Sequence, residues 1–153
     1  RRIMYTDIIQ QIKTLLEGVV IGEIDGNEIN PTVYPHPLGE GESPSSYPAI
    51  VFFPTNFNNE FQTATSEYKE LNFSVFVIIN AEQISKEDLF TYSLPNVADK
   101  VIQEIDLGWD FGRTDNGKRI WTRADVGTWG SAVEESGETA FIDINLIIKL
   151  ETN

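Results

Sequence analysis

The sequence contains no cysteine, and this absence excludes several kinds of site at once. A disulfide framework, a thiolate zinc site, an iron–sulfur cluster and a cysteine nucleophile all need that side chain. His36 is the only histidine, so a metal site with several histidine ligands is excluded as well. We therefore expect neither a metal ion nor a cofactor in this protein.

Basic residues are also scarce. The chain has 11 Lys and Arg against 24 Asp and Glu, which gives a net charge of −13. Nucleic acids and anionic membrane surfaces both attract basic side chains, so this balance argues against either as a specific partner. No apolar run approaches the ~18–20 residues of a membrane span. Composition thus predicts a soluble acidic domain without a membrane contact.

The 153 residues, 41% of them apolar, suffice for one domain with a substantial core. We assign residues 1–153 to a single domain that carries a proline-rich loop at about 30–48. That segment holds five of the seven prolines, and proline removes a backbone donor and fixes φ. Regular structure is therefore not expected there.

The charges are segregated along the chain. Residues 14–68 contain eight acidic residues but no Lys or Arg. Two clusters of opposite sign come later: the basic residues Arg113, Lys118, Arg119 and Arg123, and the acidic residues Glu134, Glu135 and Glu138. Exposed ion pairs within a monomer contribute only about 0–1 kcal/mol. Two solvated loops of opposite sign are the simplest interpretation of this pattern, and complementary patches on neighbouring subunits are the alternative.

Apolar residues at helical spacing predict the first element, a helix from about Thr6 to Gly18. Its stripe consists of Ile8, Ile9, Ile12, Leu15, Leu16 and Val19. We expect the Thr6 hydroxyl to cap the free N–H groups of the first turn, and Gly18 to end the helix with a positive φ. The Asp25-Gly26 pair between two apolar runs then predicts a short hairpin.

Two strands are predicted in the middle of the chain. The apolar run Ala49–Phe53 indicates a buried strand that Pro54 ends, followed by a loop over residues 55–66. Residues 67–80 alternate so regularly that we expect one long strand. Its second face carries Phe76 and Ile78, which helices of the same chain or a neighbouring subunit must cover.

The remaining residues predict two helices and a long hairpin. Ser85 is expected to cap the first helix, and Pro95 to begin the second. Residues 120–132 and 139–151 predict two strands joined by the acidic loop Glu134–Glu138. This element order lacks strict β–α–β alternation. It predicts an α+β fold, a mostly antiparallel sheet of long strands packed by an N-terminal helix and a central helical segment.

Gly127 and Gly130, inside the first of these two strands, indicate bulges or close backbone approaches. Trp109, Trp121 and Trp129 are interpreted as core or interface anchors.

No catalytic constellation emerges from the sequence. Carboxylates are so numerous that some pair is expected to lie close by chance, which singles out none. A phosphate loop, a nucleophile elbow and a dinucleotide fingerprint are all absent. We therefore expect no enzymatic activity.

Four segments carry a resemblance to a known family. They are the opening helix Met4–Ile12 and the strands Tyr47–Pro54, Leu71–Ile79 and Phe141–Leu150. In this pattern, which spans almost the whole chain, the sequence resembles the tail terminator and tail-completion (head–tail joining, neck) proteins of tailed bacteriophages. The proline-rich loop at 30–48 is longer than the pattern requires.

The resemblance implies a structural virion protein and not an enzyme. Its subunits would form a homo-oligomeric ring, typically a hexamer, that ends the tail tube and joins it to the neck or connector protein. Genome DNA would pass through the lumen without specific binding, because the carboxylates of an acidic ring repel phosphates. Such a protein is assembled in the host cytoplasm and resides in the virion.

Contacts between subunits are expected at two sets of residues. The first set is apolar and lies on the second faces of the long strands: Phe76, Ile78 and Ile147. The second set is charged and complementary: Arg119 and Arg123, with Glu134 and Glu135 as their partners. The alternative function is an acidic protein-binding module, of the inhibitor or immunity type, that masks a basic partner.

Overall fold

A computed structural model describes residues 5–24, 26–61, 67–82, 84–108, 118–134 and 137–152. Predictions that concern Trp109, Arg113 and Glu135 lie outside these residues. The elements are α1 (Tyr5–Glu17), β1 (Gly22–Ile24), β2 (Asn27–Ile29), β3 (Thr32–Tyr34), β4 (Ala49–Phe61), β5 (Glu67–Asn80), α2 (Lys86–Asp88), the π-helical turn η1 (Leu89–Ser93), α3 (Leu94–Leu107), β6 (Lys118–Glu134) and β7 (Gly137–Thr152).

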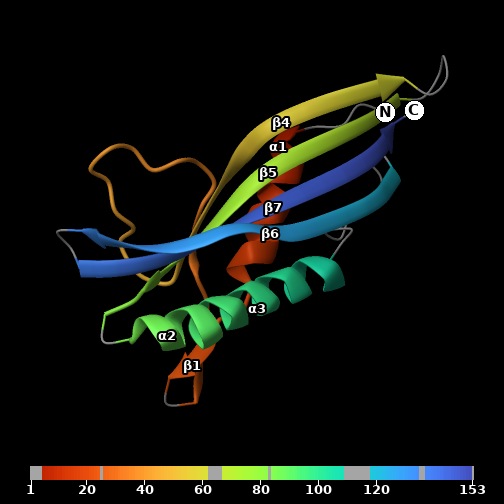
Figure 1. The fold of residues 1–153 in the computed structure, drawn as a ribbon. Coiled ribbons are helices and arrows are strands. Elements are labelled where there is room, and N and C mark those ends of the chain that lie inside the picture. Colours follow the sequence, from red (N-terminus) through yellow and green to blue (C-terminus); the bar gives the residue numbers. More distant parts are fainter. Residues whose placement is uncertain are drawn as a thin grey trace.

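A five-stranded sheet forms the centre of the fold. Its strand order is β3-β4-β5-β7-β6, and every neighbouring pair is antiparallel except β3 with β4. The strands β1 and β2 form a separate hairpin across Asp25-Gly26, as predicted. Figure 1 shows the long strands as one curved sheet, with α1 crossing behind it and α3 running along its β6 side. The predicted α+β class and mostly antiparallel sheet are confirmed.

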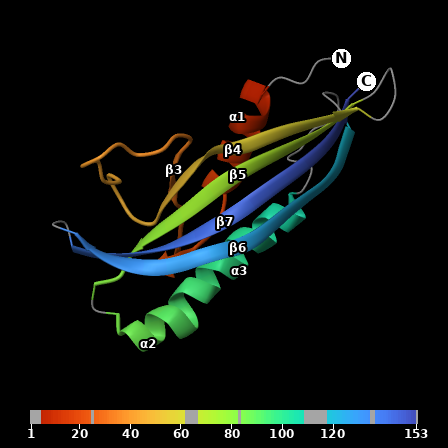
Figure 2. The same cartoon turned by 45° about the horizontal axis from the view of Figure 1, so that its top comes forward.

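Strand alternation decides which side chains enter the core. In β5 and β7 every second residue is fully buried against α1 and α3, because successive side chains of a strand point to opposite faces of the sheet. The buried set is Leu71, Phe73, Val75, Val77, Ile142, Ile144, Leu146, Ile148 and Leu150. The turned view in Figure 2 likewise places the sheet on one side and the two helices together on the other. The alternation predicted for residues 67–80 is confirmed, and β7 follows the same period.

The helix α1 keeps its predicted stripe but differs at both ends. Ile8, Ile12 and Leu16 are fully buried, as the helical spacing indicates. Thr6 lies inside the first turn, since the helix already includes Tyr5, so the predicted N-cap is wrong. Gly18 closes the last turn with an N–H bond to the Leu15 carbonyl at 3.1 Å, without the positive φ we expected.

The strand β4 is longer than its apolar run. It continues through Pro54 to Phe61 and pairs with β5 along its length, so the loop predicted at 55–66 is wrong for residues 55–61. The register shifts between Pro54 and Asn56. A bulge tolerates the missing proline N–H, and backbone pairing with β5 then resumes as far as Phe61.

The segment 86–107 is one continuous helical stretch. Ser85 is its N-cap as predicted, because its hydroxyl accepts the Asp88 N–H at 3.1 Å. Pro95 does not begin a separate helix but lies in the first turn of α3. In the π turn before it, the Leu94 N–H donates to the Leu89 carbonyl, and this wider turn carries the chain past proline.

The hairpin β6–β7 extends beyond the predicted strands. Val133 pairs with Glu138 and Glu134 with Gly137, so only two residues separate the strands. The predicted loop Glu134–Glu138 is therefore mostly part of the ladder. The proline-rich segment also departs from the prediction at one place, because Thr32–Tyr34 forms β3 and pairs in parallel with Ala49–Val51.

The two glycines of β6 occupy positions where a Cβ atom would meet a close neighbour. Gly127 lies at a register shift between Val126 and Thr128, which is a bulge. A Cβ on Gly130 would lie 3.2 Å from the Phe141 ring, which is a closer contact than most Cβ atoms make. Both predictions for these glycines are confirmed.

Candidate interaction surface

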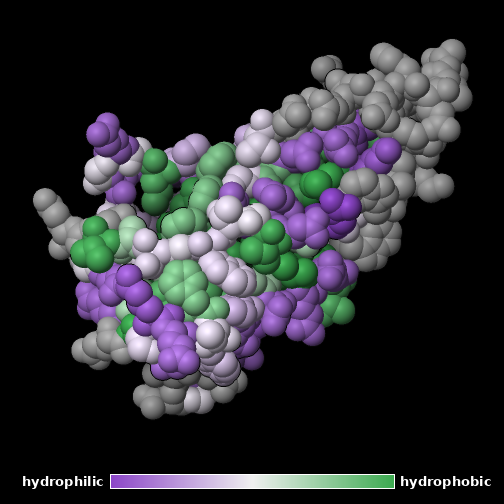
Figure 3. Space-filling view, in the orientation of Figure 1, coloured by the Kyte–Doolittle hydropathy of each residue, from purple (hydrophilic) through white to green (hydrophobic). Residues whose placement is uncertain are grey.

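The face of the sheet opposite the helices is the first candidate for a functional surface. The ladder pairs Val51 with Phe76, Ala49 with Ile78 and Ile78 with Phe141. Paired residues of a sheet share a face. Figure 3 looks onto this face and shows apolar atoms gathered among hydrophilic ones. We call this the helix-free face; it is formed by Val51, Phe53, Phe76, Ile78, Phe141, Ile147 and the polar residues between them.

Three aromatic rings form a row across the helix-free face. The rings of Phe53 and Phe76 stack with centroids 6.2 Å apart and planes at 22°. The rings of Phe76 and Phe141 tilt at 51° with centroids 6.1 Å apart. Phe76 is therefore the middle member, and each aromatic contact adds about 0.5–1.5 kcal/mol to the burial of area.

A buried hydrogen bond lies beside this row. Ser74 is only 5% exposed, and its hydroxyl donates to Asp143 Oδ1 at 2.7 Å. A hydrogen bond to a charged acceptor is stronger than a neutral one. It holds β5 and β7 in register at the centre of the helix-free face.

The proline-rich loop covers part of this face, and the helices do not. Leu38, Pro44 and Tyr47 of the loop and Phe76 and Ile78 of β5 line a cavity of about 320 Å³. Both β5 residues stay partly exposed. Of the two covers considered from the sequence, helices of the same chain are wrong, because α1 and α3 pack on the opposite face.

The loop is tied at its base by hydroxyl groups. The Tyr34 hydroxyl oxygen accepts the Ser45 N–H at 3.0 Å and lies 2.9 Å from the Ser45 hydroxyl. These bonds lower the pKa of Tyr34 because they stabilise its phenolate. A second contact joins β3 to the loop, because the hydroxyl groups of Thr32 and Ser46 lie 2.8 Å apart. The loop is thus closed by side chains of β3.

We expect the change Tyr34→Phe to loosen the loop without unfolding the sheet. The variant removes the acceptor of the Ser45 amide and leaves the ring in place. Hydrogen exchange at the Ser45 amide should therefore become faster, whereas amides in β5 and β7 should keep their rates. Thr14→Val, which removes an exposed hydroxyl on α1, is the control. An unchanged rate at Ser45 would contradict this role of Tyr34.

Ile147 lies on the helix-free face but apart from the row of aromatic rings. It pairs with Asn72 in β5 and with Arg123 in β6. It lies four residues beyond Asp143 along β7, which corresponds to about 13 Å. The structure therefore brings Phe76 and Ile78 together and leaves Ile147 separate.

The predicted charged residues lie at opposite ends of β6. Arg123 and Glu134 are eleven residues apart in one strand, or about 36 Å, and Arg119 lies further still. Arg123 donates instead to Asp125, with 2.8 Å between Nε and Oδ2 and both side chains more than half exposed. An exposed pair of this kind adds little stability. Within one subunit the two ends of β6 cannot meet.

A second apolar surface, which the sequence analysis did not identify, lies on β6. This surface consists of Val126, Trp129 and Val133, whose exposed fractions are 38%, 40% and 83%. Their partners in β7 lie on the face of the sheet that packs against the helices. The bulge at Gly127 explains their common side, because one extra residue puts Val126 and Trp129 on the same face. Their irregular spacing concealed this stripe from a search for strict alternation.

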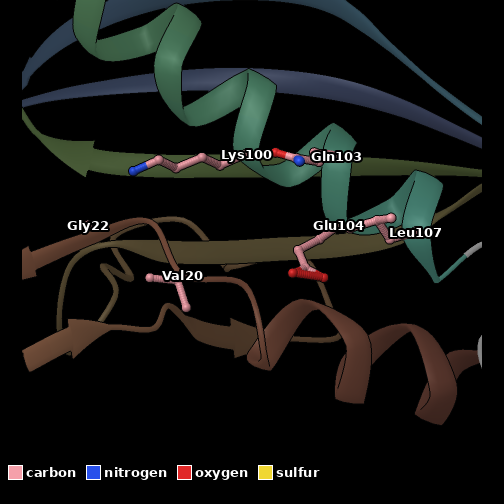
Figure 4. A pocket seen from close by; sticks show the side chains of 6 residues that line it. All are labelled: Val20, Gly22, Lys100, Gln103, Glu104 and Leu107. Atoms are coloured by element: carbon pink, nitrogen blue, oxygen red, sulfur yellow. The ribbon is translucent and has the colours of Figure 1, made fainter.

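One further hollow lies between α3 and the segment after α1 (Figure 4). It measures about 330 Å³ and is lined by Val20, Gly22, Lys100, Gln103, Glu104 and Leu107. The Lys100 ammonium donates to the Ile21 carbonyl at 2.9 Å, so this lysine fastens the segment to α3. We assign the hollow a structural role.

Within the described ranges, no three His, Asp or Glu residues are grouped so that they could hold a metal ion. Among the helices described, none is long and apolar enough to cross a membrane.

Comparison with protein-family models and with curated protein sequences finds no match to this chain.

Proposed function

We propose that this chain is a structural protein of a tailed-bacteriophage virion. In this proposal its copies form a ring, most simply a hexamer, at the head–tail junction. The ring ends the tail tube and joins it to the neck protein, and genome DNA passes through its lumen. Assembly takes place in the host cytoplasm before the protein enters the virion.

One observation above all supports this proposal. The helices lie on one face of a long-stranded sheet, and the opposite face carries a row of aromatic rings that the proline-rich loop covers only in part. A contiguous, partly exposed apolar surface of this kind is typical of protein–protein interfaces. The element order that resembles the phage family and the net charge of −13 are consistent with a subunit around DNA.

Infection with a phage that lacks this gene tests the role directly. We expect cells to accumulate filled heads and separate tails that do not join. Purified wild-type protein added to the extract should restore joined particles, and electron microscopy should show it at the head-proximal end of the tail. Joined, infectious particles without the gene product would contradict the proposal. Retention of the protein by a basic host protein, with heads and tails already joined, would favour the acidic binding module instead.

The proposal also predicts that the purified protein has no enzymatic turnover. The described residues offer no metal cluster, and the sequence offers no nucleophile with a partner base. In hydrolase and nuclease assays with added divalent cations, the measured rate should therefore not exceed that of buffer alone. Reproducible turnover that one Asp→Asn or Glu→Gln change abolishes would overturn the structural role.

A further inference from the structure

The strand β6 is a long edge of the sheet. It runs from Lys118 to Glu134 and pairs only with β7 among the strands described. An edge strand presents unpaired N–H and C=O groups that can pair with another chain. Residues 125–129 are all exposed, so neither face of the strand is covered at this place.

The middle of this edge is apolar. Val126 and Trp129 are exposed, and together with Gly127 and Thr128 they line a shallow hollow of about 310 Å³ at the bulge. Large exposed aromatic residues are frequent anchors of protein interfaces. The apolar surface therefore lies halfway along the strand, with the two charged clusters on either side of it.

The charges along β6 are arranged with opposite polarity at its two ends. The strand begins with Lys118, Arg119 and Arg123, and it ends at Glu134 with two further acids, Glu135 and Glu138, close behind. If a second copy pairs antiparallel, its acidic end meets the basic end of the first copy, and the reverse holds at the other end. A parallel pairing would instead place like charges together.

We propose that two copies of this chain pair through their β6 edges, antiparallel and about a two-fold axis near Val126–Thr128. The contact joins the two sheets into one and packs the stripe of Val126 and Trp129 against its copy at the centre. It is isologous, the most common form of self-association. Its oppositely charged ends fix the register of the two strands.

This pairing does not depend on the proposed place at the head–tail junction. It uses one edge of the sheet and leaves the helix-free face open for other contacts. It also gives the complementary charges, which cannot meet within one subunit, a definite arrangement between two.

Because the chain has no cysteine, a single introduced thiol tests the symmetry. Thr128→Cys places the two thiols beside the axis, and oxidation should convert most of the protein into a disulfide-linked dimer. Ala132→Cys is the control. It lies about five residues from the centre of the axis in each copy, so its thiols are roughly 33 Å apart and should not link. Equal linking of both variants, or of neither, would overturn the two-fold pairing.

Molar mass from light scattering tests the contact itself. In the absence of tail and neck proteins, we expect wild-type protein to be a dimer and Trp129→Lys to be a monomer with unchanged circular dichroism. Tyr92→Lys, which alters a more exposed aromatic residue on η1, should remain a dimer. A wild-type protein that stays monomeric at every concentration would overturn the inference. A closed ring in which Thr128→Cys does not link would also overturn it, because such a ring is built from head-to-tail contacts.

Charge exchange supplies a test that a loss of folding cannot imitate. The variant Arg119→Glu/Arg123→Glu and the variant Glu134→Lys/Glu135→Lys should each dimerise at least tenfold more weakly at low salt. Mixed together they should form a heterodimer, because each then meets a complementary end. The defect should shrink at high salt, where charges are screened within a few ångströms. Monomers that remain monomers after mixing, or an arginine variant that dimerises like wild type, would remove the charged ends from the interface.

Discussion

Changing Phe76 and Ile78 together to Ser should prevent ring assembly while leaving the monomer folded. Both side chains are partly exposed on the helix-free face, so the monomer loses only part of their burial. In a ring they would be fully covered, and each lost anchor costs about 1–2 kcal/mol of association. Since about 1.4 kcal/mol is tenfold in affinity, we expect ring assembly to weaken by roughly two orders of magnitude.

Joined particles counted after complementation with the variant gene, and the urea midpoint of the purified variant, measure the two effects separately. Thr139→Ser, at the rim of the same cavity, is a matched control that keeps a hydroxyl and should behave like wild type. Normal virion assembly by the double variant would show that this face is not the ring interface. A large loss of folding stability would show that the proline-rich loop covers these residues more completely than their exposure indicates.

The largest effect on folding should come from a residue on the other face of the same strand, Phe73. Phe73 is 1% exposed, and its ring meets that of Phe52 edge to face at 6.4 Å between centroids. Truncation to Ala leaves a cavity in the core. We expect Phe73→Ala to lower the free energy of unfolding by about 3–5 kcal/mol.

Urea denaturation followed by circular dichroism measures this loss. Phe73→Leu, which keeps most of the volume, should cost less than half as much. A loss below about 1 kcal/mol for Phe73→Ala would contradict the assignment of this side to the core. Together with Phe76, the pair tests whether alternate residues of β5 serve two different functions, folding on one side and association on the other.

Much of this architecture follows from sequence periodicity. The stripe of α1 and the alternation in β5 and β7 predict the buried positions correctly, because burial of one face imposes a period on the sequence. Phe76, Ile78 and Ile147 were also placed on the correct second face by the same alternation. Periodicity did not reveal what lies over them, since that depends on the path of an irregular loop with no repeat of its own.

The errors share a physical cause. Pro54 was taken as the end of a strand and Pro95 as the start of a second helix, but a bulge and a π turn carry the chain past these positions. The apolar stripe on β6 was missed because the bulge at Gly127 breaks the alternation. Local irregularities of this type change the register by one residue. A sequence rule based on a fixed period cannot follow them.

The strand order has a consequence for how the chain folds. The central strands β5 and β7 are separated in sequence by the whole helical segment and by β6, and Glu67 of β5 pairs in the ladder with Thr152 of β7. Pairing of such distant residues requires the closure of a long loop, which slows folding, whereas the local hairpin β6–β7 forms readily. We therefore expect β4–β5 and β6–β7 to form as two early units that dock late, with the unpaired sides of β5 and β7 exposed to aggregation until the last strand is in place.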